Sequence, residues 1–453
     1  MMNLSHRNAA HRLLMLAAGS AAVVLLAGTS LSAAGLSVDD KPVAAVAAAT
    51  DPRLADFTAA ADYSAKLGGR AVLVMHKGKI VFERYDNNWN ANMPHPLASG
   101  TKSFTGVTAA IAIKQGLISG WDELVCDTIT EWKTDPVKKD ITLRHLLTLS
   151  SGLDPSDDTL GTSGGSRVLG PGTGSRQERN RGSREVSDKF KAAVTTESVA
   201  KPGARFEYGP SHYFAFGEFL QRKLTASKTL PPEQKTVMGY MQANLFDPIG
   251  LKVGRFGKDA AGNPNLPGGC MLTAREWVKF GQLVLQDGTW TGSDGKPVQV
   301  VDKALLAECM KPSATNKFYG FTWWLLRENG QTGTEGDGLG RLAGGGAGGV
   351  GGVGGAGGAG DDRGDLRARL RQAALSREAS NDFPRPDGQP WNVFMAAGLG
   401  KQRLFVLPQE DMVIVRFAEN GPEGRSFDNG EFLSLALGYK KDNKAAKPAK
   451  PGQ

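Results

Sequence analysis

The stretch HPLASGTKSFTG, residues 95–106, places Ser99 three residues before Lys102. Residues three apart lie on one helix face, so we expect the Lys102 amine beside the Ser99 hydroxyl if a helix begins here. The N-terminus of such a helix also favours developing negative charge. The stretch therefore predicts either a nucleophilic serine with an adjacent base or an N-capping serine followed by a solvated lysine. A helical pattern follows directly, with apolar residues at roughly helical spacing: Phe104, Val107, Ile111 and Ile118.

The same Ser-x-x-Lys spacing occurs twice more, at Ser198/Lys201 and Ser293/Lys296. Lys201 is followed by Pro-Gly, and Ser293 begins the sequence SDGK, so both pairs have the composition of turns. The context of Ser99 is different because an amphipathic helix follows it. We therefore take Ser99 as the candidate nucleophile of the three.

A rival nucleophile lies in the sequence GTSGG at residues 161–165, which matches the Gly-x-Ser-x-Gly elbow around Ser163. The elbow requires a buried strand before the serine and a helix after it. The flanking sequences DPSDDTL and SRVLGPGTGS have neither pattern. A flexible linker is the better interpretation of Ser163, and a Ser-His-Asp arrangement has no support from the histidine positions.

Strand patterns lie at both ends of the chain, and helical patterns lie between them. Residues 71–86 and 402–418 each show two runs of strand-forming residues around a turn, which is typical of β-hairpins. Helical sequences include KSFTGVTAAIAIKQGLI and TLRHLLTL. We expect an α/β chain of the α+β type, with an antiparallel sheet built from both ends and a helical subdomain inserted between its strands.

Two stretches interrupt this pattern. Residues 154–187 are rich in Ser, Gly, Arg and Asp, and residues 331–390 include a tract, 344–360, in which twelve of seventeen residues are glycine. Neither composition buries enough apolar surface to offset the entropy of ordering. Both are predicted to be flexible insertions within a single domain of residues 35–438. The tract lacks the Gly-Lys-Ser/Thr ending of a phosphate-binding loop.

The termini account for most of the net charge of +8. Residues 1–34 combine arginines, an apolar run and small residues, which predicts a cleaved signal peptide and a periplasmic or extracellular protein. Residues 439–453 hold five lysines and one aspartate, which is typical of a disordered basic tail. The body is close to neutral, so we expect no nucleic-acid partner, and no later segment approaches transmembrane length.

The three cysteines, Cys126, Cys270 and Cys309, allow at most one disulfide and form no metal-binding spacing. Each is expected in the core. No metal or organic cofactor is implied.

Five segments of the chain occur in a familiar order. They are SGTKSFTG (99–106), ITLRHLLTLSSGL (141–153), PGARFEYGPSHYFAFGEFL (202–220), YGFTWWL (319–325) and AAGLGKQRLFVLP (396–408). Together they resemble the serine β-lactamase-like superfamily, in the branch of class C β-lactamases, D-alanyl-D-alanine carboxypeptidases, related esterases and 6-aminohexanoate-dimer hydrolases. The resemblance covers about residues 70–420 apart from the two insertions, and it implies a β-lactamase/transpeptidase-like fold with the site between sheet and helical subdomain.

The resemblance implies roles for individual residues. Ser99 would be the acylated nucleophile and Lys102 its base, while Tyr208 matches the tyrosine of the Tyr-x-Asn motif and would relay the proton. The backbone N–H groups of Ser99 and Lys401 would form the oxyanion hole. Gly398-Leu399-Gly400 matches the Lys/His-x-Gly motif, so Gly398 and Gly400 would line the substrate site. Trp323 is a further candidate for the acyl pocket, with the core as its alternative.

Two departures from the family pattern bear on the substrate. Pro210 stands where the family usually has asparagine, and Gly398 stands where a lysine would bind a substrate carboxylate. A neutral ester or amide is therefore better supported than a β-lactam or a D-amino-acid peptide, unless Lys401 or Arg403 replaces the cation.

The sequence thus predicts an exported serine hydrolase acting on a small molecule or short peptide, with its oligomeric state open. The alternative is a catalytically degraded relative that binds an envelope ligand. A third hypothesis is a structural exported domain whose insertions and tail bind partners.

Overall fold

The computed structural model describes residues 54–155, 186–328, 380–381, 390–419 and 427–439, all within the unit Lys41–Gln453. The predicted signal peptide lies outside the described residues. So do most of the two predicted insertions and all of the predicted basic tail except Tyr439. Strand β9 (Ser380–Asn381) is a described part of the predicted Gly-rich insertion.

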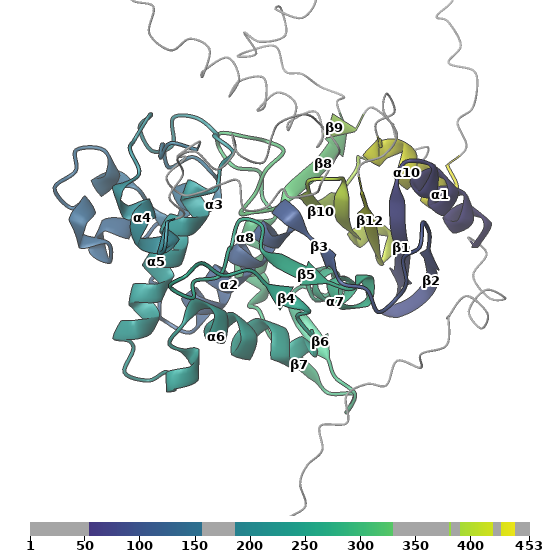
Figure 1. Cartoon of the computed structure of the whole chain (residues 1–453), viewed down its shortest axis with the longest axis horizontal. Coiled ribbons are helices and arrows are strands. Elements are labelled where there is room, and N and C mark those ends of the chain that lie inside the picture. Colours follow the sequence, from purple (N-terminus) through teal and green to yellow (C-terminus); the bar gives the residue numbers. More distant parts are fainter. Residues whose placement is uncertain (1–53, 156–185, 329–379, 382–389, 420–426, 440–453) are drawn as a thin grey trace, which may run out of the picture. The chain divides into compact units, whose positions relative to one another are not determined.

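The main sheet has seven strands in the order β2-β1-β12-β11-β10-β8-β9 (Figure 1). Its pairs are antiparallel except for β8 and β9, which are parallel. Strand β1 pairs with β12 through Leu73 and Val415, so the predicted assembly of the sheet from both ends of the chain is confirmed. The remaining strands are β1 (Gly69–His76), β2 (Lys79–Tyr85), β8 (Trp324–Glu328), β10 (Val393–Gly398), β11 (Gln402–Leu407) and β12 (Met412–Ala418).

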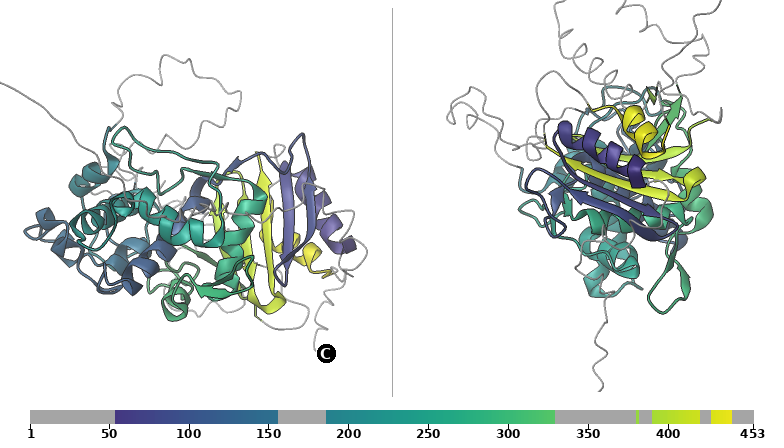
Figure 2. Two further views of the ribbon diagram at one scale, coloured as in Figure 1. Left: turned by 90° about the horizontal axis from the view of Figure 1, so that it is seen from below. Right: turned by 90° about the vertical axis from the view of Figure 1, so that its right-hand side faces the viewer.

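Helices cover both faces of this sheet, and alternate residues of each strand meet different helices. Helix α7 (Ala274–Leu285) packs so closely that a Cβ on its Gly281 would lie 2.4 Å from Val413 of β12. On the opposite face, Phe405 of β11 stacks on Phe432 of α10 (Asn429–Ala436) with ring centroids 5.9 Å apart. Helix α1 (Leu54–Lys66) lies beside α10 (Figure 2). The central strands β11 and β12 are therefore buried on both faces.

The helical part lies between β2 and β8 in the sequence, as predicted. Helices α4 and α5 pack tightly, because a Cβ on Gly217 would lie 2.3 Å from the ring of Phe190. The helices of this part, together with those that flank the sheet on the same side, are α2 (Ser103–Lys114), α3 (Leu143–Leu147), α4 (Lys189–Thr195), α5 (Ser211–Ala226), α6 (Val237–Met241) and α8 (Lys303–Cys309).

A small sheet, β3-β5-β4, anchors the segment that leads into α2. The backbone N–H of Leu97 donates to the carbonyl of Cys270 at 2.9 Å. This bond ties the start of the Ser99 stretch to residues 267–272. The strands are β3 (His95–Pro96), β4 (Arg255–Phe256) and β5 (Cys270–Leu272), and a separate hairpin joins β6 (Thr289–Thr291) to β7 (Pro297–Gln299).

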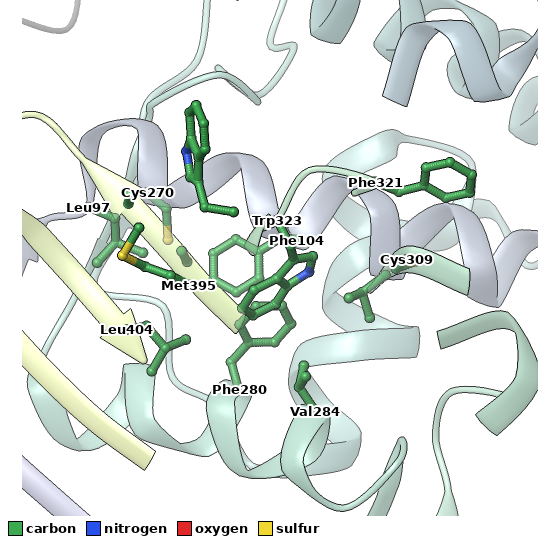
Figure 3. Packing of buried hydrophobic residues seen from close by; sticks show 14 of the residues in the cluster. Leu97, Phe104, Cys270, Phe280, Val284, Cys309, Phe321, Trp323, Met395 and Leu404 are labelled. Atoms are coloured by element: carbon green, nitrogen blue, oxygen red, sulfur yellow. The ribbon is translucent and has the colours of Figure 1, made fainter. Parts of the chain in front are cut away.

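The hydrophobic core extends under α2 and includes Trp323, which was expected in the acyl pocket. Trp323 is fully buried and stacks on Phe280, and Phe280 in turn contacts Phe104 (Figure 3). A side chain with no exposed surface does not line a substrate pocket in this structure. Trp323 is therefore a core residue, which was the alternative interpretation. The three cysteines are free and buried, as expected.

Candidate active site

The segment around Ser99 forms a 3-10 helix, η2 (Ala98–Lys102), that runs directly into α2. Leu97 occupies the N-cap position and Ala98 has a φ of +48°, a left-handed conformation that L residues adopt at a cost. Ser99 therefore lies in the first turn instead of capping it. The N-cap interpretation of Ser99 is therefore wrong.

Lys102 is the buried partner of Ser99. Its side chain is 5% exposed, and its Nζ lies 3.1 Å from Ser99 Oγ and 2.5 Å from the carbonyl oxygen of Pro267. The amine also lies 5.2 Å from the ring centroids of both Tyr208 and Tyr213, within the range of cation–π attraction. The interpretation of Lys102 as a solvated lysine is thus wrong, because burial and these contacts hold its amine at the serine.

The two tyrosines beside Lys102 have different surroundings. Tyr213 is buried, its hydroxyl is 2.8 Å from that of Tyr319, and burial raises the pKa of Tyr213 well above its ordinary value. Tyr208 is partly exposed, and its ring stacks on Trp324 at 5.8 Å. Tyr208 is therefore the tyrosine that can meet both Lys102 and a substrate, whereas Tyr213 stays within the buried network.

The turn that carries Tyr208 is held by His212. The Nδ1 atom of His212 lies 2.8 Å from Ser151 Oγ, and its Nε2 atom lies 2.8 Å from the carbonyl oxygen of Glu207. Burial lowers the pKa of His212 to about 4, so the ring is neutral at pH 7. With both nitrogens engaged away from Ser99, His212 fixes the backbone beside Tyr208.

The turn between β10 and β11 lies against the Ser99 segment. A Cβ on Gly398 would lie 2.0 Å from the carbonyl oxygen of Leu97, so no side chain fits there. Gly400 and Lys401 follow with φ of +77° and +63°. Leu399, between Gly398 and Gly400, is 62% exposed. The absence of a lysine at position 398 thus has a steric cause. The backbone at the end of β10 lies directly against the backbone of Leu97, which precedes Ser99.

Arg403 cannot replace that cation. Its side chain is fully buried, with Nε donating to Asn429 Oδ1 at 2.9 Å and Nη1 donating to the carbonyl of Gly398 at 3.2 Å. It therefore lies beneath the turn and away from any substrate. Lys401 is partly exposed. Pro210 takes the N-cap position of α5, and its carbonyl accepts from the N–H of Tyr213.

Pro267 and Tyr213 are two contacts of Lys102 that sequence reasoning missed. Pro267 acts through its backbone carbonyl, which no side-chain motif reports. Tyr213 lies five residues after Tyr208, and only the fold brings its ring to the amine. The rival Ser163 lies outside the described residues, and Ser293 lies exposed in the β6–β7 turn.

A separate cavity of about 530 Å³ lies in the helical part, between α4, α5 and the segment 131–138. Its charged lining groups are in ion pairs: Arg222 with Glu131 and Lys138 with Asp135 within the lining, and Lys191 with Asp188 beside it. It shares no residue with the Ser99 site.

Over the part of the chain that the structure describes, no cluster of histidine, cysteine and carboxylate side chains is arranged to hold a metal ion. The helices described here are also too short or too polar to cross a membrane.

Solved structures share this fold over most of their length. A Bacillus anthracis protein provisionally named as a 6-aminohexanoate-dimer hydrolase is 18% identical, with a TM-score of 0.53 over 82% of this chain and 78% of its own. A D-stereospecific amidohydrolase from Streptomyces sp. is 13% identical, with a TM-score of 0.52 over 84% and 98%. EstCE1, a hydrolase with promiscuous acyltransferase activity, is 15% identical, with a TM-score of 0.50 over 89% and 100%. At these identities the likeness shows the fold.

Family membership comes from the sequence itself. No curated protein matches the chain. The profile of the family described as Beta-lactamase matches residues 54–431, which include Ser99, Lys102, Tyr208 and the β10–β11 turn. The resemblance and the fold predicted from the sequence are therefore confirmed, and the chain belongs to the Beta-lactamase family of serine hydrolases.

Proposed function

We propose that the protein hydrolyses an ester or amide through an acyl-enzyme formed on Ser99. The observation that carries the proposal is the 3.1 Å contact between Ser99 Oγ and the buried Nζ of Lys102. A serine hydroxyl is a weak nucleophile at neutral pH and needs an adjacent base. Among the residues that the structure describes, Lys102 is the amine within hydrogen-bond distance of Ser99 Oγ.

The proposed mechanism begins with transfer of the Ser99 proton to neutral Lys102 as the oxygen attacks the substrate carbonyl. The carbonyl of Pro267 and the two tyrosine rings stabilise the ammonium that forms. Tyr208 then relays a proton to the leaving group and later helps to activate water. The backbone N–H groups of Ser99 and Lys401 stabilise the oxyanion in both steps.

We further propose that the acyl group of the substrate is uncharged. Gly398 leaves no room for a side chain, Arg403 is buried, and Leu399 presents an apolar side chain to solvent beside the turn. These features supply an apolar surface at the position of the missing cation. Of the two candidate replacement cations, only the partly exposed Lys401 remains, and we propose that it does not bind a substrate carboxylate. A small ester, a small amide or a short peptide fits this description, and the proposed mechanism uses no cofactor.

Two of the structural neighbours are named for amide hydrolysis and one for acyl transfer. All three names are consistent with a serine acyl-enzyme, and none decides between ester and amide for this chain. Residues 1–34 have the pattern of a signal peptide, so we place the reaction outside the cytoplasm, in the periplasm or the extracellular space.

The test is a comparison of wild type and Ser99→Ala on a neutral p-nitrophenyl ester, an ester that carries a carboxylate, and a chromogenic cephalosporin. We expect Ser99-dependent hydrolysis of the neutral ester, with the highest kcat/KM of the three. A higher kcat/KM for the carboxylate ester or the cephalosporin would overturn the assignment of an uncharged acyl group. Binding of these compounds without turnover would point to the degraded, ligand-binding alternative.

A further inference from the structure

We propose that Arg416, with Arg403 beside it, is a positioning residue that orients the β10–β11 turn so that the Lys401 N–H faces the reacting carbonyl. This inference rests on the proposed function, because it assigns a purpose to a buried group behind the proposed oxyanion hole. The turn is defined as residues 398–402.

The two arginines occupy an unusual place for guanidinium groups. Both side chains are fully buried, and they stand directly opposite each other on β11 and β12. They point to the face of the sheet covered by α1 and α10, since Arg416 bonds to Ser64 of α1 and Arg403 bonds to Asn429 of α10. Two cations thus lie side by side under the turn.

Buried donors hold the carbonyl groups of the turn from below. Arg416 Nη1 donates to Lys401 O at 2.8 Å, and Arg403 Nη1 donates to Gln402 O at 2.9 Å and Gly398 O at 3.2 Å. The side-chain amide of Gln402 donates to Leu399 O at 3.1 Å. The peptide that carries the Lys401 N–H therefore lies between two peptides whose carbonyls are fixed. Because peptide units are planar, fixing both neighbours restricts the direction of that N–H.

Arg416 is in turn fixed by the opposite layer. Its Nε donates to Ser64 Oγ at 2.8 Å and its Nη2 donates to Leu67 O at 3.1 Å, just past the end of α1. The C-terminal end of a helix favours a positive charge. The guanidinium carbon also lies 3.8 Å from the ring centroid of Phe427. A planar group with donors in three directions suits these positions, and a lysine amine has no comparable geometry.

The energetic cost of the arrangement favours a role beyond packing. Burying a charged group is unfavourable unless it is well bonded, and two cations facing each other across a strand pair repel. Burial, and then the neighbouring Arg403, lower the pKa of Arg416 to about 9. An apolar side chain would fill the same space without these costs. Unlike an apolar side chain, the arginines donate hydrogen bonds to the carbonyl groups of the turn.

The experiment compares wild type, Arg416→Lys and Arg416→Ala by kcat, KM and thermal unfolding, using the neutral p-nitrophenyl ester. We expect Arg416→Ala to lower kcat by about tenfold to a hundredfold, with KM changed by less than about threefold, because an oxyanion donor acts on the transition state. Arg416→Lys should lie between the two. Millimolar guanidinium ion should restore part of the kcat of Arg416→Ala and leave wild type unchanged.

Arg275→Met is the matched control, because Arg275 forms a shielded ion pair with Glu83 at 2.8 Å away from the turn. It should lower the unfolding temperature while kcat changes by less than about twofold. A folded Arg416→Ala with wild-type kcat would overturn the inference alone. If Arg416→Ala does not fold, a wild-type kcat for Arg416→Lys would overturn it equally. If wild type shows no hydrolysis that depends on Ser99, the proposed function is overturned, and this inference is overturned with it.

Discussion

The start of η2 and the β10–β11 turn meet at the same site, yet they contribute to it in different ways. At η2 the chemistry is in side chains: the hydroxyl of Ser99 and the buried amine of Lys102 lie 3.1 Å apart. At the turn the contribution is backbone. Gly398 allows the close approach to Leu97, and Gly400 and Lys401 adopt left-handed conformations.

This difference decides how each region responds to substitution. A side chain that reacts can be deleted with little change to its surroundings, so its loss should appear in the rate and not in stability. A backbone group can be disturbed only through its supports, so substitutions around the turn should affect rate and stability together. The predictions below follow this contrast, from the largest expected effect to the smallest.

Deleting the nucleophile should have the largest effect. We expect Ser99→Ala to lower kcat by at least about 10⁴-fold, because no other group in the site forms the acyl-enzyme. The measurement is steady-state hydrolysis of the neutral ester. The matched control is Ser293→Ala, which removes an exposed serine with the same spacing to a lysine and should leave kcat unchanged. Equal activity in Ser99→Ala and wild type would place the chemistry elsewhere.

Removing the base should come next. Lys102→Met should lower the acylation rate by about 10²-fold to 10⁴-fold, the range of general base catalysis. Stopped-flow acylation measures this rate, and thermal unfolding reports stability in parallel. Lys114→Met at the end of α2, the helix that follows η2, is the control, since the Lys114 side chain is 66% exposed and pairs with Asp302 at the surface. A similar small effect of both variants on acylation would remove Lys102 from the mechanism.

The turn should show a coupled loss of rate and stability. In Gly398→Ala the new Cβ meets the Leu97 carbonyl oxygen at 2.0 Å, so one backbone must move. We expect the free energy of unfolding to fall by about 1–3 kcal/mol and kcat to fall by about tenfold. Gly120→Ala is the control, because nothing lies within 4 Å of its added Cβ. A rate loss without a stability loss would contradict the contrast between the two regions.

The smallest effect on the rate should come from His212, which supports Tyr208 only indirectly through the Glu207 carbonyl. The pKa of His212 in the folded protein is about 4, below the ordinary value of 6.5. Between pH 4 and pH 6.5 the unfolded chain therefore binds more protons than the folded chain. The stabilisation is full above about pH 6.5 and is lost as the pH falls toward 4, by about 3 kcal/mol in all. In urea unfolding, the stability gap between wild type and His212→Gln should shrink over this range. A gap that stays constant would show that His212 does not titrate as described.

The contrast also explains what the sequence could predict. The hairpins at 71–86 and 402–418 follow from runs of strand-forming residues around a turn, and the structure confirms them. A helix also follows Ser99 as predicted, but it is not amphipathic, because residues 103–112 are all buried. Ser99 and Lys102 lie three residues apart, so local helix geometry alone brings them together. The family resemblance supplied Tyr208 and the turn, and the structure places the Tyr208 ring beside the Lys102 amine.

Other parts of the site depend on contacts between distant segments. Pro267 meets Lys102 through a carbonyl, and Arg403 lies under the turn where no sequence pattern distinguishes it from a substrate-binding cation. Trp323 immediately precedes β8, Trp324 is the first residue of that strand, and the two side chains have different surroundings. The fold buries Trp323 against Phe280 and places Trp324 against Tyr208, which is a choice of strand register that one sequence does not reveal.

The most direct test of the central claim is intact-protein mass spectrometry after treatment with a fluorophosphonate probe, followed by peptide mapping. We predict a single adduct on Ser99 in wild type, no adduct in Ser99→Ala, and an adduct that forms far more slowly in Lys102→Met. An adduct on another serine such as Ser163, or no adduct on a folded wild-type protein, would contradict the assignment of Ser99 as the nucleophile.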